Sequence, residues 1–192
     1  MTEKRFRTDP YLTTARRVML ERSAAFPILD ARKTGNDIIY RLPAGHDLQQ
    51  RQPVDIVIDW QRRYRLMRLH FAAEIVLELM YRALPGVEKI GAHIAADKAR
   101  VDFAWPENIT SLLLHVQERV DAIIAAGRPI ISDFSDRAAG CRFWEIPDFA
   151  RVPCGGTHLR RSGEIGAVTL KRCNLGKAKE RIEVLLRDDC RE

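Results

Sequence analysis

The stretch Val152-Pro-Cys-Gly-Gly-Thr-His-Leu159 organises this sequence, and Gly163-Glu-Ile-Gly166 follows it closely. Cys154 and His158 stand four residues apart with two glycines between them. A helix is unfavourable there, because each glycine costs about 1 kcal/mol in a helix interior. We therefore expect a loop that turns a thiol and an imidazole towards one point. This pair of ligands suits a borderline divalent metal, zinc first.

Two protein ligands do not close a tetrahedral zinc site, so further ligands have to come from elsewhere in the chain. The best source is His70-Phe-Ala-Ala-Glu74, which lies in a helical pattern where residues i and i+4 share one face. A short Cys/His pair is by itself a weak signal, because a buried thiol often lies near a surface imidazole without any metal. The hypothesis is a zinc site with four ligands: His70, Glu74, Cys154 and His158.

Length and composition bound the class of protein. The chain has 192 residues, of which 46% are hydrophobic and 30% charged, as in one ordinary globular domain or two small ones. No apolar run approaches the roughly 20 residues that span a bilayer, and the charged N-terminus has no apolar segment after it, so we expect neither a membrane span nor a signal peptide. The cysteines show no disulfide spacing. We therefore expect a cytoplasmic protein with reduced thiols.

The formal net charge of +6 favours an anionic partner, with tRNA among the candidates. A basic surface that only keeps the protein in solution is the simpler explanation of the charge alone. Arg62, Arg63, Arg65 and Arg68 crowd the first turns of a predicted helix, where positive charge opposes the helix dipole. This crowding indicates a partner anion or nearby carboxylates, and a solvated arginine face is the alternative.

Apolar periodicity predicts the secondary structure. Residues 1–60 contain short apolar runs between turn residues, and 53–59 alternates as a half-buried strand does. A helix is predicted from Trp60 until Pro85-Gly86 stops it. Residues 87–105 predict a hairpin, and 109–124 predict a second helix that ends before Gly127 and Pro129.

The remaining segments predict further strands and loops. We expect a strand over 129–134, an irregular segment over 135–151, and a closing antiparallel pair, 165–170 with 181–186, around a basic loop over 171–179. The fold class is thus α+β: an antiparallel sheet with two main helices, preceded by a small β-rich segment. The predicted domains are residues 1–60, small and β-rich, and residues 61–192, the core that carries the metal site.

Four ordered stretches carry a family resemblance: Arg62-Arg-Tyr-Arg-Leu-Met-Arg-Leu-His-Phe-Ala-Ala-Glu74, Gly91-Ala-His-Ile-Ala-Ala-Asp-Lys-Ala-Arg-Val-Asp-Phe103, Pro153-Cys-Gly-Gly-Thr-His158 and Ser162-Gly-Glu-Ile-Gly166. Together they resemble the editing domain of alanyl-tRNA synthetase, which the free-standing AlaX-type alanyl-tRNA editing proteins share. Asp9-Pro-Tyr-Leu12 and Val57-Ile-Asp-Trp60 match as well. The resemblance covers nearly the whole chain.

The resemblance implies hydrolysis of tRNA(Ala) mischarged with serine, and for some members with glycine. It also implies zinc bound by a helical H-x-x-x-H and a later C-x-x-x-H. His70, Cys154 and His158 match three of these ligands, whereas Glu74 stands in place of the second helical histidine. A carboxylate can ligate zinc, so the site either survives with an altered charge or is weakened. The glycine-rich motif that many members carry in the N-terminal segment is absent, which bears on serine recognition.

Further residues are candidates for substrate binding. Gly155, Gly156 and Thr157 can bring backbone N–H groups close to a carbonyl, although a tight turn explains them as well. Several cations are candidates for phosphate contact, although a solvated side chain is the simpler explanation of each one alone: Arg68, Lys98, Arg100, Lys171, Arg172, Lys177 and Lys179. The sequence contains no Ser-His-Asp order that would support a covalent mechanism, and it leaves the catalytic residues unassigned.

Three functions follow as hypotheses. The first is a trans-editing hydrolase that deacylates mischarged tRNA(Ala), above all Ser-tRNA(Ala), with a metal-assisted water. The alternative from a different class is a tRNA- or synthetase-binding module of the same fold that has lost hydrolysis. A third is a metal-dependent hydrolase of a small ester. The sequence leaves the oligomeric state undecided.

Overall fold

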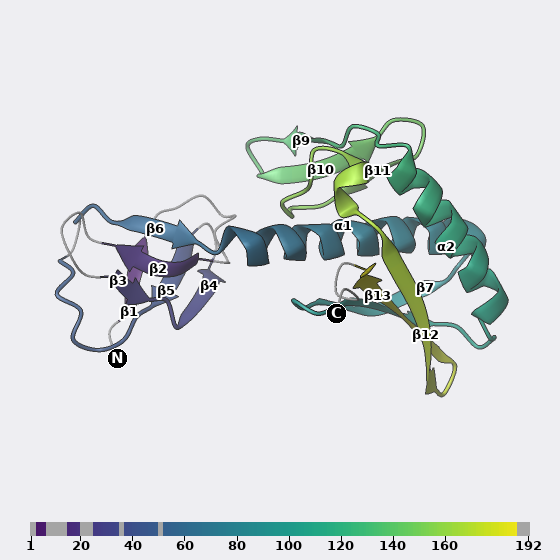
Figure 1. Cartoon of the computed structure of the whole chain (residues 1–192), viewed down its shortest axis with the longest axis horizontal. Helices are drawn as coiled ribbons and strands as arrows, with labels where there is room; N and C mark the ends of the chain where they lie inside the picture. The colour runs from purple at the N-terminus through teal and green to yellow at the C-terminus, as the bar shows by residue number, and fades with distance from the viewer. Residues whose placement is uncertain (1–2, 7–14, 20–24, 35–36, 50–51, 188–192) are drawn as a thin grey trace. The chain divides into compact units, whose positions relative to one another are not determined.

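The computed structural model describes residues 3–6, 15–19, 25–34, 37–49 and 52–187 (Figure 1). The Asp9-Pro-Tyr-Leu12 motif lies outside the described residues. The chain divides into two compact units, Met1–Tyr64 and Arg65–Glu192, and each is described by itself. Among the described residues, no helix is both long and apolar enough to cross a lipid bilayer.

The N-terminal unit is built from short antiparallel strands, which confirms the predicted β-rich segment. Its strands form two three-stranded sheets, ordered β1-β5-β4 and β3-β2-β6. Ile38 and Tyr40 are fully buried and pack against partly buried Ile28, Ala31 and Ile56. The strands are β1 (Glu3–Phe6), β2 (Ala15–Met19), β3 (Ala25–Pro27), β4 (Asp30–Thr34), β5 (Asp37–Arg41) and β6 (Asp55–Ile58).

Helix α1 (Trp60–Ala83) confirms the first predicted helix. Asp59 caps it, because its Oδ1 accepts a 3.0 Å hydrogen bond from the Arg62 amide. Gly86, with φ of +85°, follows its end. Ten of the fourteen residues from Met67 to Met80 are buried. A helix buried to this extent is enclosed by other elements on most sides, and Figure 1 shows α1 running between two sheets of the second unit.

The larger sheet of this unit is antiparallel, with strand order β12-β13-β8-β7. Side chains on its strands alternate between the core and the outer face, as in a sheet with one buried side. Helix α2 (Thr110–Ala125) buries Val116 and Val120, and Gln117 bonds the backbone of β12 at Leu170. These elements confirm the α+β class and the predicted hairpin. The strands are β7 (Glu88–Ile94), β8 (Ala99–Ala104), β12 (Val168–Gly176) and β13 (Lys179–Leu186).

The basic loop predicted over 171–179 is wrong. Strands β12 and β13 continue through these residues as an antiparallel ribbon. Only Lys177 and Ala178 remain as the turn, and their φ angles of +50° and +56° suit a tight two-residue hairpin. The polar composition misled the prediction, because an exposed ribbon can carry charged side chains without losing its backbone pairing.

The irregular segment predicted over 135–151 is also wrong, because most of it is strand. Strands β9 (Ile131–Asp136), β10 (Cys141–Ile146) and β11 (Ala150–Pro153) form a second antiparallel sheet, ordered β11-β10-β9. Fully buried Trp144 packs edge-on against Phe71 of α1, with ring centroids 5.0 Å apart. This contact holds the small sheet against α1, and the chain leaves β11 directly into the Cys154 loop.

Candidate metal centre

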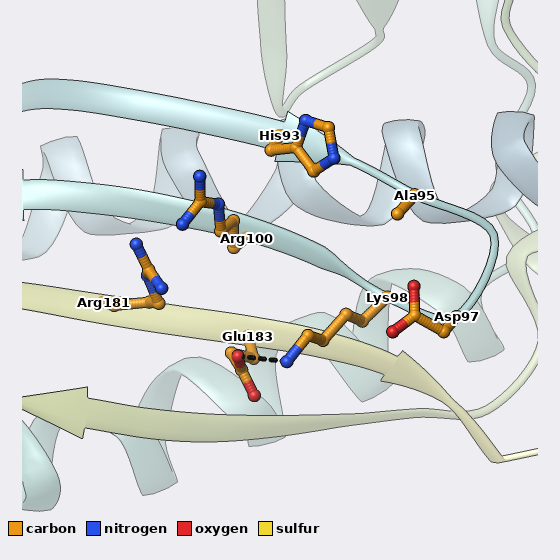
Figure 2. Close-up of a pocket in the computed structure, with 7 residues that line it drawn as sticks. All are labelled: His93, Ala95, Asp97, Lys98, Arg100, Arg181 and Glu183. Carbon is orange, nitrogen blue, oxygen red and sulfur yellow. Dashed lines mark hydrogen bonds and ion pairs between the residues drawn. The ribbon is translucent and has the colours of Figure 1, made fainter.

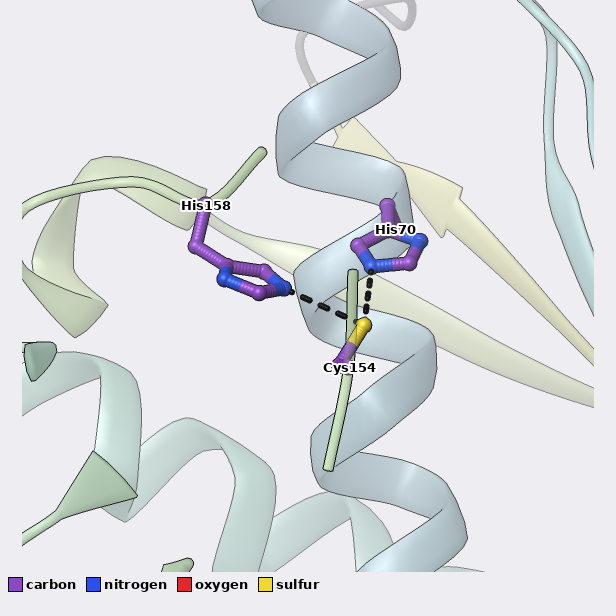
Figure 3. A group of neighbouring side chains, drawn as sticks. All are labelled: His70, Cys154 and His158. Carbon is purple, nitrogen blue, oxygen red and sulfur yellow. Dashed lines mark hydrogen bonds between the residues drawn. The ribbon is translucent and has the colours of Figure 1, made fainter. Parts of the chain in front are cut away.

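Three side chains predicted as metal ligands converge at one point (Figure 3). His70 comes from α1, and Cys154 and His158 come from the loop after β11. Their ligand atoms all lie within 4.8 Å of one another. Cys154 Sγ is 3.6 Å from His70 Nε2 and 3.4 Å from His158 Nε2. We call His70, Cys154 and His158 the ligand triad.

These separations fit a zinc ion. With Zn–S of about 2.3 Å and Zn–N of about 2.0 Å, tetrahedral geometry places a sulfur and a nitrogen ligand about 3.5 Å apart. Both observed S···N distances lie within about 0.1 Å of that value. A thiolate with two imidazoles is also a donor set that zinc prefers over magnesium or calcium. The triad is therefore compatible with zinc in chemistry and in spacing.

Position 156 has to be glycine, because there is no space for a side chain beside the triad. A Cβ atom at this position would lie 2.7 Å from His70 Nε2, 3.2 Å from His158 Nε2 and 3.3 Å from Cys154 Sγ. The Gly156 amide points at Cys154 Sγ from 3.4 Å. Gly155, by contrast, has open space among the described atoms within 4 Å of such a Cβ. The two neighbouring glycines therefore have different roles.

Glu74 lies next to the triad but further away than its members. Its Oε1 is 3.8 Å from His70 Nε2 and 4.0 Å from Cys154 Sγ. A carboxylate ligand of zinc would be expected about 3.3 Å from the nitrogen and about 3.5 Å from the sulfur. The indole of Trp144 donates a 3.2 Å hydrogen bond to the other carboxylate oxygen. Glu74 is thus oriented towards the site and needs a shift of about half an ångström to join it.

Burial sets the protonation of the triad. Desolvation lowers the pKa of His158 to about 4, with the charges of His70 and Arg142 as smaller causes. His158 is therefore neutral at pH 7, which is the form that binds metals. Its Nδ1 lies 3.1 Å from Ser132 Oγ, so Nε2 faces the triad while Ser132 orients the ring. Burial raises the pKa of the Cys154 thiol, and the Gly156 amide acts in the opposite direction.

Arg68, a predicted phosphate contact, donates a hydrogen bond to the protein backbone in this structure. Its Nε donates a 2.7 Å hydrogen bond to the carbonyl of Ile165, at the end of the short 3-10 helix η1 (Ser162–Ile165). A Cβ at Gly166 would lie 2.6 Å from Arg68 Nη2. Arg68 therefore joins α1 to the Gly163–Gly166 motif. Arg65 likewise donates to a backbone carbonyl, that of Ala96.

Lys98 and Arg100 line a cavity of about 320 Å³ on the larger sheet, shown in Figure 2. Lys98 Nζ is 2.5 Å from a carboxylate oxygen of Glu183. Arg100 alternates along β8 with buried Ala99 and Val101, so its side chain points to the outer face of the sheet. The structure therefore does not bring these two cations together with the ligand triad.

Comparison with known proteins first identifies the class of protein to which this chain belongs. The family described as the threonyl and alanyl tRNA synthetase second additional domain matches residues 141–183, a span that begins with β10 and contains Cys154 and His158. The resemblance seen in the sequence is confirmed. The chain belongs to the AlaX-M family of alanyl-tRNA editing proteins.

The relatives differ in how much of their length the chain covers. It is 32% identical to the alanyl-tRNA editing protein AlaX-M of Pyrococcus horikoshii over 137 residues, which are 69% of this chain and 62% of that protein. It is 31% identical to AlaX-M of Saccharolobus solfataricus over 170 residues, 79% of this chain and 71% of that protein. The alanine–tRNA ligase of Sulfurisphaera tokodaii is 28% identical over 83% of this chain, which is 20% of the ligase.

Sequence reasoning missed three residues around the triad: Ser132, Arg142 and Trp144. Ser132 orients His158, Trp144 orients Glu74, and the charge of Arg142 acts on both Cys154 and His158. The only available signal was an aromatic pair, Phe143-Trp144, in a polar segment. Such a pair predicts a buried strand, but it cannot indicate which side chains the strand brings to a metal site.

Proposed function

We propose that this chain hydrolyses the ester bond of mischarged tRNA(Ala), above all Ser-tRNA(Ala). The observation that carries the proposal is the ligand triad, whose S···N distances of 3.4 and 3.6 Å suit zinc. Membership of the AlaX-M family supports the substrate class. The site of action would be the cytoplasm, where a charged tRNA is available.

The residues around the triad have separate tasks in this proposal. His70, Cys154 and His158 would hold the zinc, with Glu74 as the fourth ligand. When bound, the zinc would supply a Lewis acid that makes water a better nucleophile at neutral pH; with four protein ligands it would have to take that water as a fifth ligand. The aminoacyl ester is already activated, so the protein has mainly to position the substrate and stabilise developing negative charge. Of the two loop glycines, exposed Gly155 is the better candidate for close approach to the substrate.

The test is deacylation measured on matched substrates. Purified protein is incubated with Ser-tRNA(Ala) and, in parallel, with Ala-tRNA(Ala), and bound zinc is quantified in the same preparation. Rapid loss of serine with slow loss of alanine is expected. Cys154→Ala should abolish both zinc binding and serine release. Equal rates for the two substrates would contradict the proposed specificity, and an unchanged rate for Cys154→Ala would contradict the role of the triad.

A second candidate function is a tRNA-binding module that has lost hydrolysis. Its support is Glu74, a carboxylate at a ligand position that lies 4.0 Å from Cys154 Sγ. Retained binding of tRNA(Ala) without any deacylation, in protein fully loaded with zinc, would favour this function over the first.

A further inference from the structure

Phe134, Arg142 and Cys154 lie side by side across the small sheet. Phe134 of β9 is the register partner of Arg142 on β10, and the amide of Cys154 donates a 2.9 Å hydrogen bond to the carbonyl of Arg142. Directly opposed residues of antiparallel strands point their side chains to the same face. The Arg142 side chain therefore stands on the face that carries the metal centre.

Two local features aim this side chain at the site. The register of β10 with β9 shifts between Cys141 and Arg142, and such a bulge re-aims the side chain beside it. The guanidinium carbon then lies 5.4 Å from the centre of the Phe134 ring. Its Nη1 is 3.5 Å from the carbonyl oxygen of Gly156, the glycine that backs the triad. The half-buried guanidinium is thus held at the rim of the metal centre.

The chemistry of a guanidinium defines the ligand. It has a planar array of five N–H donors, and this array can bind a phosphate in a bidentate manner. An amino acid esterified to the last ribose of an RNA has one phosphodiester nearby, the one that joins the last two nucleotides. A fixed cation beside the triad is placed for that group rather than for the neutral ester.

We propose that Arg142 binds the terminal phosphodiester of the aminoacylated RNA and thereby positions its ester at the ligand triad. The inference rests on the proposed function and adds a positioning residue to it. Arg142 forms no bond to the reacting atoms. Its effect is to raise the fraction of bound RNA whose ester lies beside His70, Cys154 and His158.

Arg137 provides a matched control. Its guanidinium carbon lies 5.0 Å from the centre of the same Phe134 ring, so it shares the aromatic contact and the charge of Arg142. It is exposed, however, and its Nη2 pairs with Asp133 at 3.0 Å. It follows β9 in the turn and has no cross-strand link to Cys154. Replacing Arg137 therefore removes an equal charge without touching the metal centre.

The experiment compares Arg142→Gln with Arg137→Gln on two substrates, in zinc-loaded protein. The first substrate is Ser-tRNA(Ala), and the second is seryl-adenosine, which has the same ester but no phosphate. Loss of a charge-assisted contact is expected to lower kcat/KM on the tRNA about 10- to 100-fold for Arg142→Gln, chiefly through KM. On seryl-adenosine, Arg142→Gln should lose clearly less activity than on the tRNA, because there only its charge beside Cys154 and His158 is removed. Arg137→Gln should leave the rates on both substrates close to those of the wild type. Arg142→Lys, which keeps the charge but not the bidentate geometry, should be intermediate.

Several outcomes would overturn the proposal. Equal losses on both substrates would mean that Arg142 supports the metal centre itself, and zinc content and thermal midpoint report such damage directly. Equal losses for the two arginine variants would mean that only general charge matters. If the wild type deacylates neither substrate, the proposed function fails, and binding of uncharged tRNA then decides for Arg142 separately. Weaker binding by Arg142→Gln than by Arg137→Gln would support the contact, and equal binding would refute it.

Discussion

Replacing Gly156 by alanine tests the geometry of the metal centre directly. The new Cβ would lie 2.7 Å from His70 Nε2, about 0.7 Å inside an ordinary carbon–nitrogen contact of about 3.4 Å. Either the imidazole or the loop has to move by about that distance. Metal–ligand bonds tolerate deviations of about 0.2 Å. We therefore expect Gly156→Ala to lose at least one ligand of the triad.

The magnitude follows from what a ligand contributes. Removal of a partner that only orients a ligand weakens metal binding about 10- to 100-fold, so displacement of a ligand itself should weaken it at least about 100-fold. That factor corresponds to about 2.7 kcal/mol of binding free energy. Competition with a chromophoric chelator measures the zinc affinity, and circular dichroism shows whether the fold is retained.

The neighbouring Gly155→Ala is the matched control, because a Cβ at that position meets no described atom within 4 Å. It should bind zinc as the wild type does. Wild-type zinc affinity in Gly156→Ala would refute the reasoning, since it would mean that His70, Cys154 and His158 are not the ligands or that the loop is displaced at no cost. Equal losses in both variants would show that any change to this loop is harmful.

Three other predictions concern Glu74, the net positive charge of the chain, and the ion pair between Asp102 and Arg181. Glu74→Ala should lower zinc content if the carboxylate ligates, whereas Glu74→His should retain or tighten binding; an unchanged zinc content in Glu74→Ala, measured by elemental analysis, would exclude Glu74 from the site. Affinity for tRNA, measured by filter binding, should fall roughly tenfold between 50 and 200 mM salt for every two phosphates contacted, and no change would leave the net charge with a role in solubility alone. Asp102 Oδ1 accepts a 2.6 Å bond from Arg181, and this bond holds the pKa of the carboxyl below its usual value. Because the folded pKa is the lower one, its stabilisation is present above the unfolded pKa of about 3.9 and is lost as the pH falls through the folded pKa. The difference in urea midpoint between the wild type and Asp102→Asn should therefore be constant from pH 7 to 5 and shrink below about pH 4; a difference that grows in acid would contradict the assignment.

Much of the architecture could be predicted from local patterns. The apolar period from Trp60 onwards predicted α1, and the stripe that includes Val116 and Val120 predicted α2. Both predictions succeeded because helical periodicity depends only on residues three or four positions apart in the sequence. The strands of 135–151 and 171–179 were missed, because pairing with a neighbouring strand can stabilise a polar segment whose own pattern is weak.

The metal centre shows the same division between local and distant information. The amino-acid sequence by itself determined the candidate ligand types and the local geometry of each half of the candidate site: His70 and Glu74 share a helical face, and Cys154 and His158 share a glycine loop. Only the tertiary structure decided that the halves meet, with Cys154 Sγ 3.6 Å from His70 Nε2. It also decided that Lys98 and Arg100 lie away from the ligand triad and that Arg142 lies beside it. The physical reason is that spacing along a chain determines which side chains share one element, whereas contact between elements depends on packing, here of Phe71 against Trp144.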